Sequence, residues 1–120
     1  LFEAEFYSLA FDALERDGIL VTHSSSPFFE PQMVSQFYST LKKVFPIVKM
    51  YSACVPTFYY GWWSFALCSK KYHPLQNFQG EKWKRLGIKT KYYNPEIHLA
   101  SFSLPTFTKE LVGVNGRDDL

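Results

Sequence analysis

Two strand-forming runs joined by a very short link constrain the fold more than any other feature of this sequence. The runs cover residues 47–55 and 62–69, and the link between them contains Gly61. Such a link allows only antiparallel pairing, because parallel neighbours need a crossover of about a dozen residues or more. The chain is therefore expected to contain an antiparallel hairpin with an aromatic corner.

The segments before this hairpin have the pattern of alternating helices and strands. Residues 1–17 repeat apolar side chains at helical spacing, and Gly18 is expected in the left-handed position that follows many helices. Residues 19–24 are apolar and β-branched, which predicts a buried strand of a parallel sheet. Residues 31–44 begin with a proline and repeat apolar side chains at helical spacing, which predicts a second helix.

This order of elements predicts the fold class. Helix, strand, helix and hairpin describe the closing part of an open α/β sheet, with one reversed strand near its edge. The expected fold is the C-terminal half of a Rossmann-like sheet of the class I methyltransferase type, ending in the antiparallel hairpin. Short helices are expected at residues 79–86, at residues 95–103 and after Pro105.

Composition excludes several classes of function. The chain has 120 residues and a formal net charge of +2, which gives no support for nucleic acid or a membrane as a partner. Cys54 and Cys68 lie in apolar runs and are expected to be buried free thiols. With no signal-peptide pattern and no spanning segment, a cytoplasmic location is expected. The sequence begins without Met inside a helical pattern, which suggests a piece of a longer protein.

Residue types alone indicate no catalytic residue, no metal site and no identifiable cofactor site. The three histidines, His23, His73 and His98, are scattered along the chain. Three serines follow the first strand at residues 24–26, but they lack the Gly-x-Ser-x-Gly frame of a nucleophile elbow. His98 is expected to have a structural role, bonding a backbone group near the helix that starts at Pro95.

The placement of aromatic residues indicates a pocket. Ligands bind outside the carboxyl ends of the strands in open α/β sheets. His23 and the corner at residues 57–61 each follow such an end, so they are expected on the same side. Packing and substrate contact both stay open for His23. A pocket wall is favoured over packing for the corner, because aromatic side chains facing solvent need a cover. The aromatic residues in question are Phe58, Tyr59, Tyr60, Trp62 and Trp63.

Four stretches carry a family resemblance: DGILVTHSSSPFF, LKKVFPIVKMYSACVPTF, GWWSFALCSKKYHP and KYYNPEIHLASFSLPTF. They resemble the C-terminal part of the spermidine synthases, which are polyamine aminopropyltransferases. The resemblance extends over residues 1–111, and its most distinctive string is residues 92–105. Residues 1–112 are expected to be the C-terminal part of such a catalytic domain, and residues 113–120 a polar tail.

The resemblance implies an activity for the parent protein. Spermidine synthases transfer an aminopropyl group from decarboxylated S-adenosylmethionine to putrescine, giving spermidine and methylthioadenosine. No tightly bound cofactor is implied, and a homo-oligomer is. The family's nucleotide loop and its catalytic aspartate precede the region that matches residue 1 here, so this chain alone is expected to be inactive.

The resemblance also implies substrate-binding positions. Trp63 matches the family's pocket, where it would lie along the methylene chain of a diamine. His23 stands where the family commonly has glutamine, and Phe58 where it has tyrosine. Tyr59 or Tyr60 would then supply the displaced hydroxyl. Two alternatives stay open: a methyltransferase-like protein using S-adenosylmethionine, and a non-catalytic interaction or dimerisation module.

Overall fold

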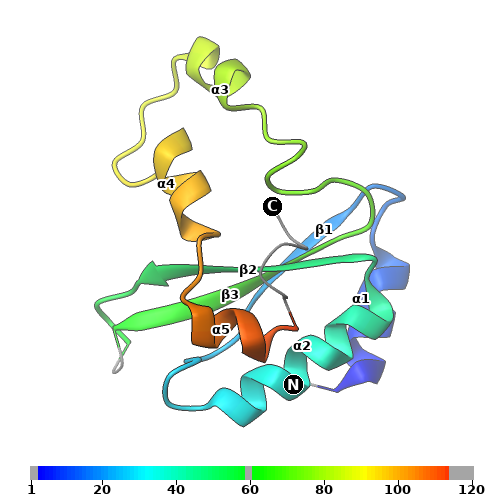
Figure 1. Cartoon of the computed structure of the whole chain (residues 1–120). Coiled ribbons are helices and arrows are strands. Elements are labelled where there is room, and N and C mark those ends of the chain that lie inside the picture. The colour runs from blue at the N-terminus through cyan, green and yellow to red at the C-terminus, as the bar shows by residue number, and fades with distance from the viewer. Residues whose placement is uncertain (1–2, 59–60, 114–120) are drawn as a thin grey trace.

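A small sheet with helices packed on both of its faces forms the centre of the molecule (Figure 1). The computed structural model describes residues 3–58 and 61–113. In chain order the elements are α1 (Ala4–Ala13), β1 (Ile19–His23), α2 (Pro31–Val44), β2 (Ile47–Cys54), β3 (Trp62–Ser69), α3 (Gly80–Leu86), α4 (Pro95–Ser101) and α5 (Thr106–Leu111).

The sheet has the order β1-β3-β2, and β3 is antiparallel to both of its neighbours. The expected hairpin of β2 and β3 is therefore confirmed. β1 and β2 run in the same direction with the reversed strand between them. His23 pairs with Phe65, and Cys54 pairs with Trp62. Because both partners lie in the first half of β3, the carboxyl ends of β1 and β2 meet at one edge of the sheet.

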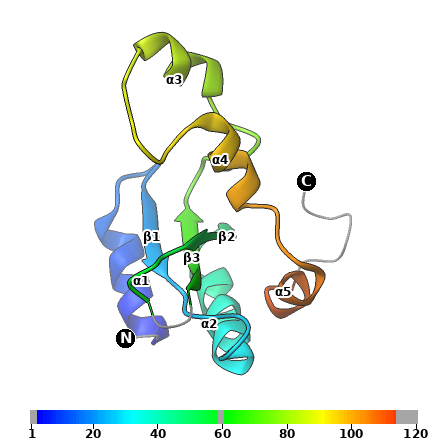
Figure 2. The same ribbon diagram turned by 90° about the vertical axis from the view of Figure 1, so that its left-hand side faces the viewer.

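Helices α1 and α2 cover one face of the sheet and form the core with it (Figure 2). The stripe of α2 buries Val34 and Leu41 completely, as the helical spacing predicts. Tyr7 of α1 meets Phe37 of α2 edge to face, with ring centroids 5.4 Å apart. The strands contribute their even-numbered residues to this core: Val48, Met50, Ala66 and Cys68.

The odd-numbered residues of the strands form the opposite face, which α4 covers in part. Tyr51 of β2 stacks on Phe65 of β3 with ring centroids 5.2 Å apart. Phe102, at the end of α4, lies 5.4 Å from Tyr51. This face remains more open, and Val21 of β1 is 50% exposed on it.

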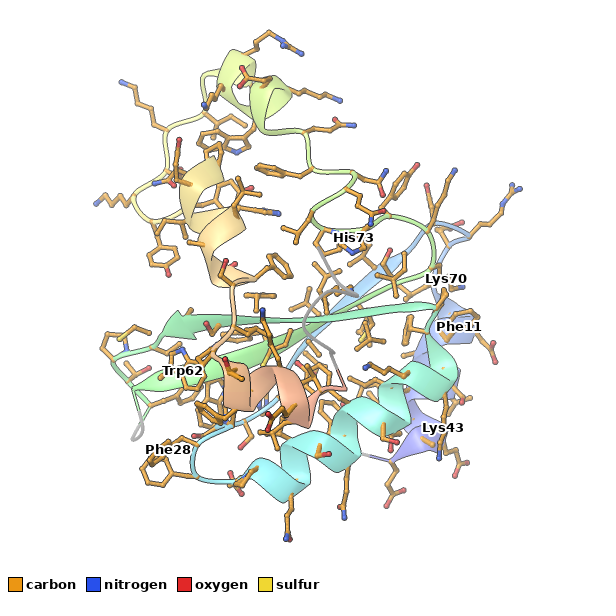
Figure 3. All side chains as sticks on the ribbon, viewed as in Figure 1. Phe11, Phe28, Lys43, Trp62, Lys70 and His73 are labelled. Atoms are coloured by element: carbon orange, nitrogen blue, oxygen red, sulfur yellow. The ribbon has the colours of Figure 1, made fainter. Side chains whose placement is uncertain are left out.

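The end of the first helix differs from the sequence prediction. α1 ends at Ala13, because Leu14 adopts an extended conformation with φ −80° and ψ 150°. Lys70 donates from Nζ to the carbonyl oxygen of Leu14 at 2.9 Å and lies 4.1 Å from the ring centre of Phe11 (Figure 3). Gly18 is not left-handed. Its constraint is close approach, since a Cβ there would lie 2.7 Å from that of Leu14.

Two burial predictions are also wrong. Cys68 is buried, but Cys54 is exposed because it lies at the end of β2 beside the corner. The first strand is not buried, since Ile19 is 46% exposed on the outer strand of the sheet. In the part of the chain that the structure describes, no helix is long and apolar enough to cross a membrane.

Candidate functional site

Three of the predicted site residues come together at the edge where β1 and β2 end. The ring of Trp63 lies 6.1 Å from that of His23 and 4.5 Å from that of Phe58, measured between centroids. Their planes are inclined by 33° and 34°, so Trp63 forms the middle of a tilted row. We call His23, Phe58 and Trp63 the aromatic cradle. Tyr59 and Tyr60, the other two predicted site residues, lie outside the described residues.

The corner that carries Phe58 is a tightly bonded turn. The amide of Val55 donates to the carbonyl of Gly61 at 2.7 Å. Inside this loop Phe58 donates to Val55, and Gly61 donates to Phe58, both at 3.0 Å. Gly61 has a φ of 78°, a conformation that other residues rarely adopt. The turn therefore brings Phe58 back onto Trp63.

Trp62 belongs to a different site. It lies 6.3 Å from Phe107 of α5, measured between ring centroids. Together with Phe28 and Phe29 these residues line an open apolar groove of about 350 Å³. Figure 3 shows Trp62 and Phe28 at the same end of the molecule. Of the two corner tryptophans, only Trp63 therefore belongs to the cradle.

A buried cluster of hydroxyl groups lies behind the cradle, on the α2 side of the sheet. The Oγ of Ser24 lies 2.9 Å from the hydroxyl of Tyr38 and 2.7 Å from the Oγ of Ser64. Tyr38 also donates to the carbonyl of Phe65 at 3.2 Å. Burial raises the pKa of Tyr38 far above its usual range, so its phenol remains protonated. We call Ser24, Tyr38 and Ser64 the hydroxyl cluster.

The turn after β1 is fastened to β3 by the same cluster. Ser25 has a φ of 71°, a left-handed conformation that is uncommon for serine. Its carbonyl accepts from the amide of Ser64 at 3.1 Å and from the Oγ of Ser64 at 2.7 Å. Its own Oγ donates to Glu30 at 2.5 Å. The sequence assigned no function to these serines, because they lack the frame of a nucleophile elbow, although three polar residues directly after a strand were a usable signal.

His98 has a structural role, as predicted, but the backbone group that it contacts lies in the loop after β3 and not at the start of α4. Its Nε2 lies 2.9 Å from the carbonyl oxygen of Pro74, and its Nδ1 lies 2.9 Å from the hydroxyl of Tyr93. The ring stacks on Phe78 with centroids 4.0 Å apart. His98 therefore ties α4 to the loop after β3. Beside it, an apolar cavity of about 240 Å³ lies between α4 and the sheet, lined in part by Tyr51 and Phe102.

The described residues do not bring any group of three or more His, Cys, Asp or Glu side chains together in a way that could hold a metal ion. The cradle offers flat aromatic surfaces and one imidazole. Aromatic faces attract ammonium groups and pack against methylene chains. The arrangement is therefore suited to a flexible, apolar chain with cationic ends.

Comparison with known proteins identifies related sequences. A sequence model described as Spermine/spermidine synthase domain matches residues 1–80. The polyamine aminopropyltransferase of Clostridium beijerinckii is 42% identical over 121 residues, which cover 99% of this chain. That of Clostridium perfringens is 45% identical over 114 residues, which cover 93% of this chain.

Solved structures show the same fold. The crystal structure of spermidine synthase from Thermotoga maritima superposes with a TM-score of 0.87 at 38% identity, over 94% of this chain. A spermidine synthase in complex with the transition state analogue AdoDATO gives the same TM-score and identity. These neighbours confirm the expected fold class. The match covers 39% of the Thermotoga chain and 42% of the Clostridium beijerinckii protein, so this chain spans about two fifths of their length.

Proposed function

Because the chain belongs to the spermine/spermidine synthase domain family, we propose that it is the C-terminal part of an aminopropyltransferase. The proposed reaction moves the aminopropyl group of decarboxylated S-adenosylmethionine to putrescine, giving spermidine and methylthioadenosine. The observation that carries this proposal is the aromatic cradle at the carboxyl ends of β1 and β2. Its Trp63 ring lies 4.5 Å from Phe58, in the place where ligands bind in this class of fold.

The role of the cradle is to hold the amine that attacks. A sulfonium is a good leaving group, so the main task of the protein is to align two flexible reactants. The amine nitrogen forms a bond to the carbon next to sulfur, the carbon–sulfur bond breaks, and methylthioadenosine leaves. Trp63 packs along the methylene chain of the diamine, and Phe58 and His23 close the two sides of this row.

The remaining catalytic parts are assigned to the other three fifths of the family's length. An ammonium cannot attack, so a carboxylate is needed to take a proton from the amine. We place this carboxylate and the nucleotide-binding loop outside residues 1–112, which leaves the 120-residue chain inactive on its own. Residues 113–120 are proposed as a polar tail, of which residues 114–120 lie outside the described residues.

The decisive experiment measures methylthioadenosine release by the full-length protein that contains this chain. Putrescine and longer amines are each supplied with decarboxylated S-adenosylmethionine. Release with one of them supports the proposal, and no release with any amine rejects it. The 120-residue chain assayed alone should release none.

A substitution in the cradle tests the assigned site. Trp63→Ala removes the surface that packs on the diamine, so the KM for the amine should rise about tenfold or more. The control is Trp83→Ala, because Trp83 lies on α3 and contacts Tyr93 at a centroid distance of 5.3 Å, away from the cradle. An unchanged KM in Trp63→Ala would assign this tryptophan to packing.

The apolar groove favours a second candidate, a non-catalytic interaction module with the family's scaffold. Phe28 is 68% exposed and Phe107 is 43% exposed, and apolar side chains this open are commonly covered by a partner. A second copy of the protein is the proposed partner, which makes a homo-oligomer. If the full-length protein forms this oligomer and transfers nothing to any amine, the module is the better description.

A further inference from the structure

Ser64 is hydrogen-bonded through both its backbone and its side chain at the point where β1 leaves the sheet. Its backbone amide donates to the carbonyl of Ser25 at 3.1 Å, and its backbone carbonyl accepts from the amide of Ser24 at 2.8 Å. Its side chain adds two further contacts, to the carbonyl of Ser25 and to the Oγ of Ser24, both at 2.7 Å. The strands are therefore joined here by hydroxyl groups as well as by backbone bonds.

Tyr38 anchors this junction to α2. Its hydroxyl contacts Ser24 at 2.9 Å and donates to the carbonyl of Phe65 at 3.2 Å. Ser24 and Tyr38 are each 1% exposed, and Ser64 is 0% exposed. Buried hydroxyl groups are costly unless they are bonded, whereas apolar residues would fill this space without that requirement. Packing alone therefore does not explain the cluster.

The neighbours of these residues along the chain supply that explanation. Ser24 follows His23, and Ser64 follows Trp63. Successive side chains of a strand point to opposite faces. The hydroxyl groups face α2, and the two rings of the cradle face the other side, with centroids 6.1 Å apart. The hydroxyl cluster therefore fixes the backbone directly beneath both rings.

We propose that Ser24, Ser64 and Tyr38 are positioning residues for the amine site, which hold His23 and Trp63 at the spacing that accepts a diamine chain. This inference rests on the proposed function for the identity of the ligand. The cluster does not touch the amine. It acts by keeping the end of β1 and the left-handed turn at Ser25 locked onto β3.

The number of hydroxyl hydrogens in the cluster predicts which substitution should disturb the cradle more. Three hydroxyl hydrogens serve four contacts, because Tyr38 donates to Phe65 and Ser64 donates to Ser25, which leaves Ser24 one hydrogen for its two neighbours. Tyr38→Phe leaves both contacts of Ser64 with a hydrogen. Ser64→Ala removes both side-chain contacts between the strands. Ser64→Ala should therefore disturb the cradle more than Tyr38→Phe.

The test compares these variants with matched controls in the full-length protein that contains this chain. Ser69→Ala is the control for Ser64→Ala, because Ser69 is also 0% exposed on β3 and its Oγ accepts from the amides of Lys71 and Tyr72 at the far end of the strand. Tyr7→Phe is the control for Tyr38→Phe, because Tyr7 is 3% exposed in the same core. Each protein is measured for the KM and kcat with putrescine, the melting temperature, and the NMR cross-relaxation between the rings of His23 and Trp63.

We expect Ser64→Ala to raise the KM about tenfold and Tyr38→Phe about threefold, with kcat changed less than about twofold. The cross-relaxation between the two rings should weaken in the same order. The controls should lower the melting temperature and leave both the KM and the ring contact unchanged.

Two results would overturn the inference. One is a lower melting temperature in Ser64→Ala and Tyr38→Phe with an unchanged ring contact, which would make the cluster purely structural. The other is an equal loss of ring contact in the controls. If Ser64→Ala does not fold, the KM and the ring contact of Tyr38→Phe decide the test. If the unsubstituted protein transfers to no amine, the proposed function fails, and the ring contact alone still decides the inference.

Discussion

At the scale of single residues, Phe58 carries no hydroxyl group, whereas the resemblance implies a tyrosine at this position. The ring of Phe58 lies 4.5 Å from that of Trp63, and the residue is 39% exposed, so it is partly open to solvent. A hydrogen bond donated by an amine N–H of the substrate to that hydroxyl oxygen would contribute about 1 kcal/mol. Phe58→Tyr should therefore lower the KM for putrescine about fivefold, measured by steady-state kinetics. Phe28→Tyr, on the exposed groove, should leave the KM unchanged. A higher KM in Phe58→Tyr would show that the apolar edge is itself needed.

The two thiols should differ in reactivity. Burial raises the pKa of Cys68 from 9.0 to about 12, whereas Cys54 is exposed. Thiolates react and thiols do not, so iodoacetamide at about pH 8 should label one cysteine in the folded chain and two in urea, counted by mass spectrometry.

The raised pKa of Cys68 also sets the direction in which the free energy of unfolding changes with pH. Between pH 9.0 and about 12 the unfolded chain loses a proton that the folded chain retains, so the free energy of unfolding falls as the pH rises. Rapid labelling of both thiols before unfolding would contradict this burial.

Residue-scale prediction from the sequence had a clear limit. His23, Phe58 and Trp63 could be placed together because each lies at or near the end of a strand, and these strand ends are encoded by local signals. The hydroxyl cluster could not, because Tyr38 lies 14 residues from Ser24, and Ser64 lies 40 residues from it. Contacts of that kind depend on how α2 lies across the sheet, which local patterns do not specify.

At the scale of elements, the effect of the tight turn between β2 and β3 on amine binding should be distinguishable from its effect on overall stability. Gly61 and Gly87 both have positive φ, 78° and 66°, and a Cβ would meet no atom within 4 Å at either position. Alanine at each should lower the free energy of unfolding by about 1 kcal/mol, measured by urea denaturation. Only Gly61→Ala should also raise the KM for the amine, because Gly87 ends α3, away from the cradle. Equal KM values in the two variants would show that the turn does not position Phe58.

The elements themselves differ in how well the sequence predicted them. α2 and the hairpin were predicted within a residue or two, because a proline start, a helical stripe and a short link are all local signals. α1 ends earlier than predicted, because Leu14 adopts an extended conformation, and its carbonyl accepts from Lys70, a residue distant in sequence. The prediction that β1 is buried was also wrong, because the burial of a strand depends on its neighbours in the sheet.

At the scale of the whole molecule, β1 is an outer strand, with one free edge in the part of the chain that the structure describes. Ile19 and Val21 are 46% and 50% exposed on it. An apolar free edge is a template for pairing with another chain. The chain spans 42% of the length of its Clostridium beijerinckii relative, so in a longer protein this edge is available for a further strand of the same sheet.

The isolated 120-residue chain should therefore self-associate through β1. Val21→Lys places a charge on this strand, and edge lysines oppose pairing between chains, so the variant should scatter less light and elute later from a sizing column. Ile88→Lys is the matched control, because Ile88 is 53% exposed but lies between α3 and α4, outside the sheet, and it should leave association unchanged. An equal reduction by both variants would mean that added charge, and not the edge of β1, governs association.

In the full-length protein, Val21→Lys should lower the melting temperature more than Ile88→Lys, measured by thermal unfolding. The reason is that a further strand beside β1 would then bury the new charge.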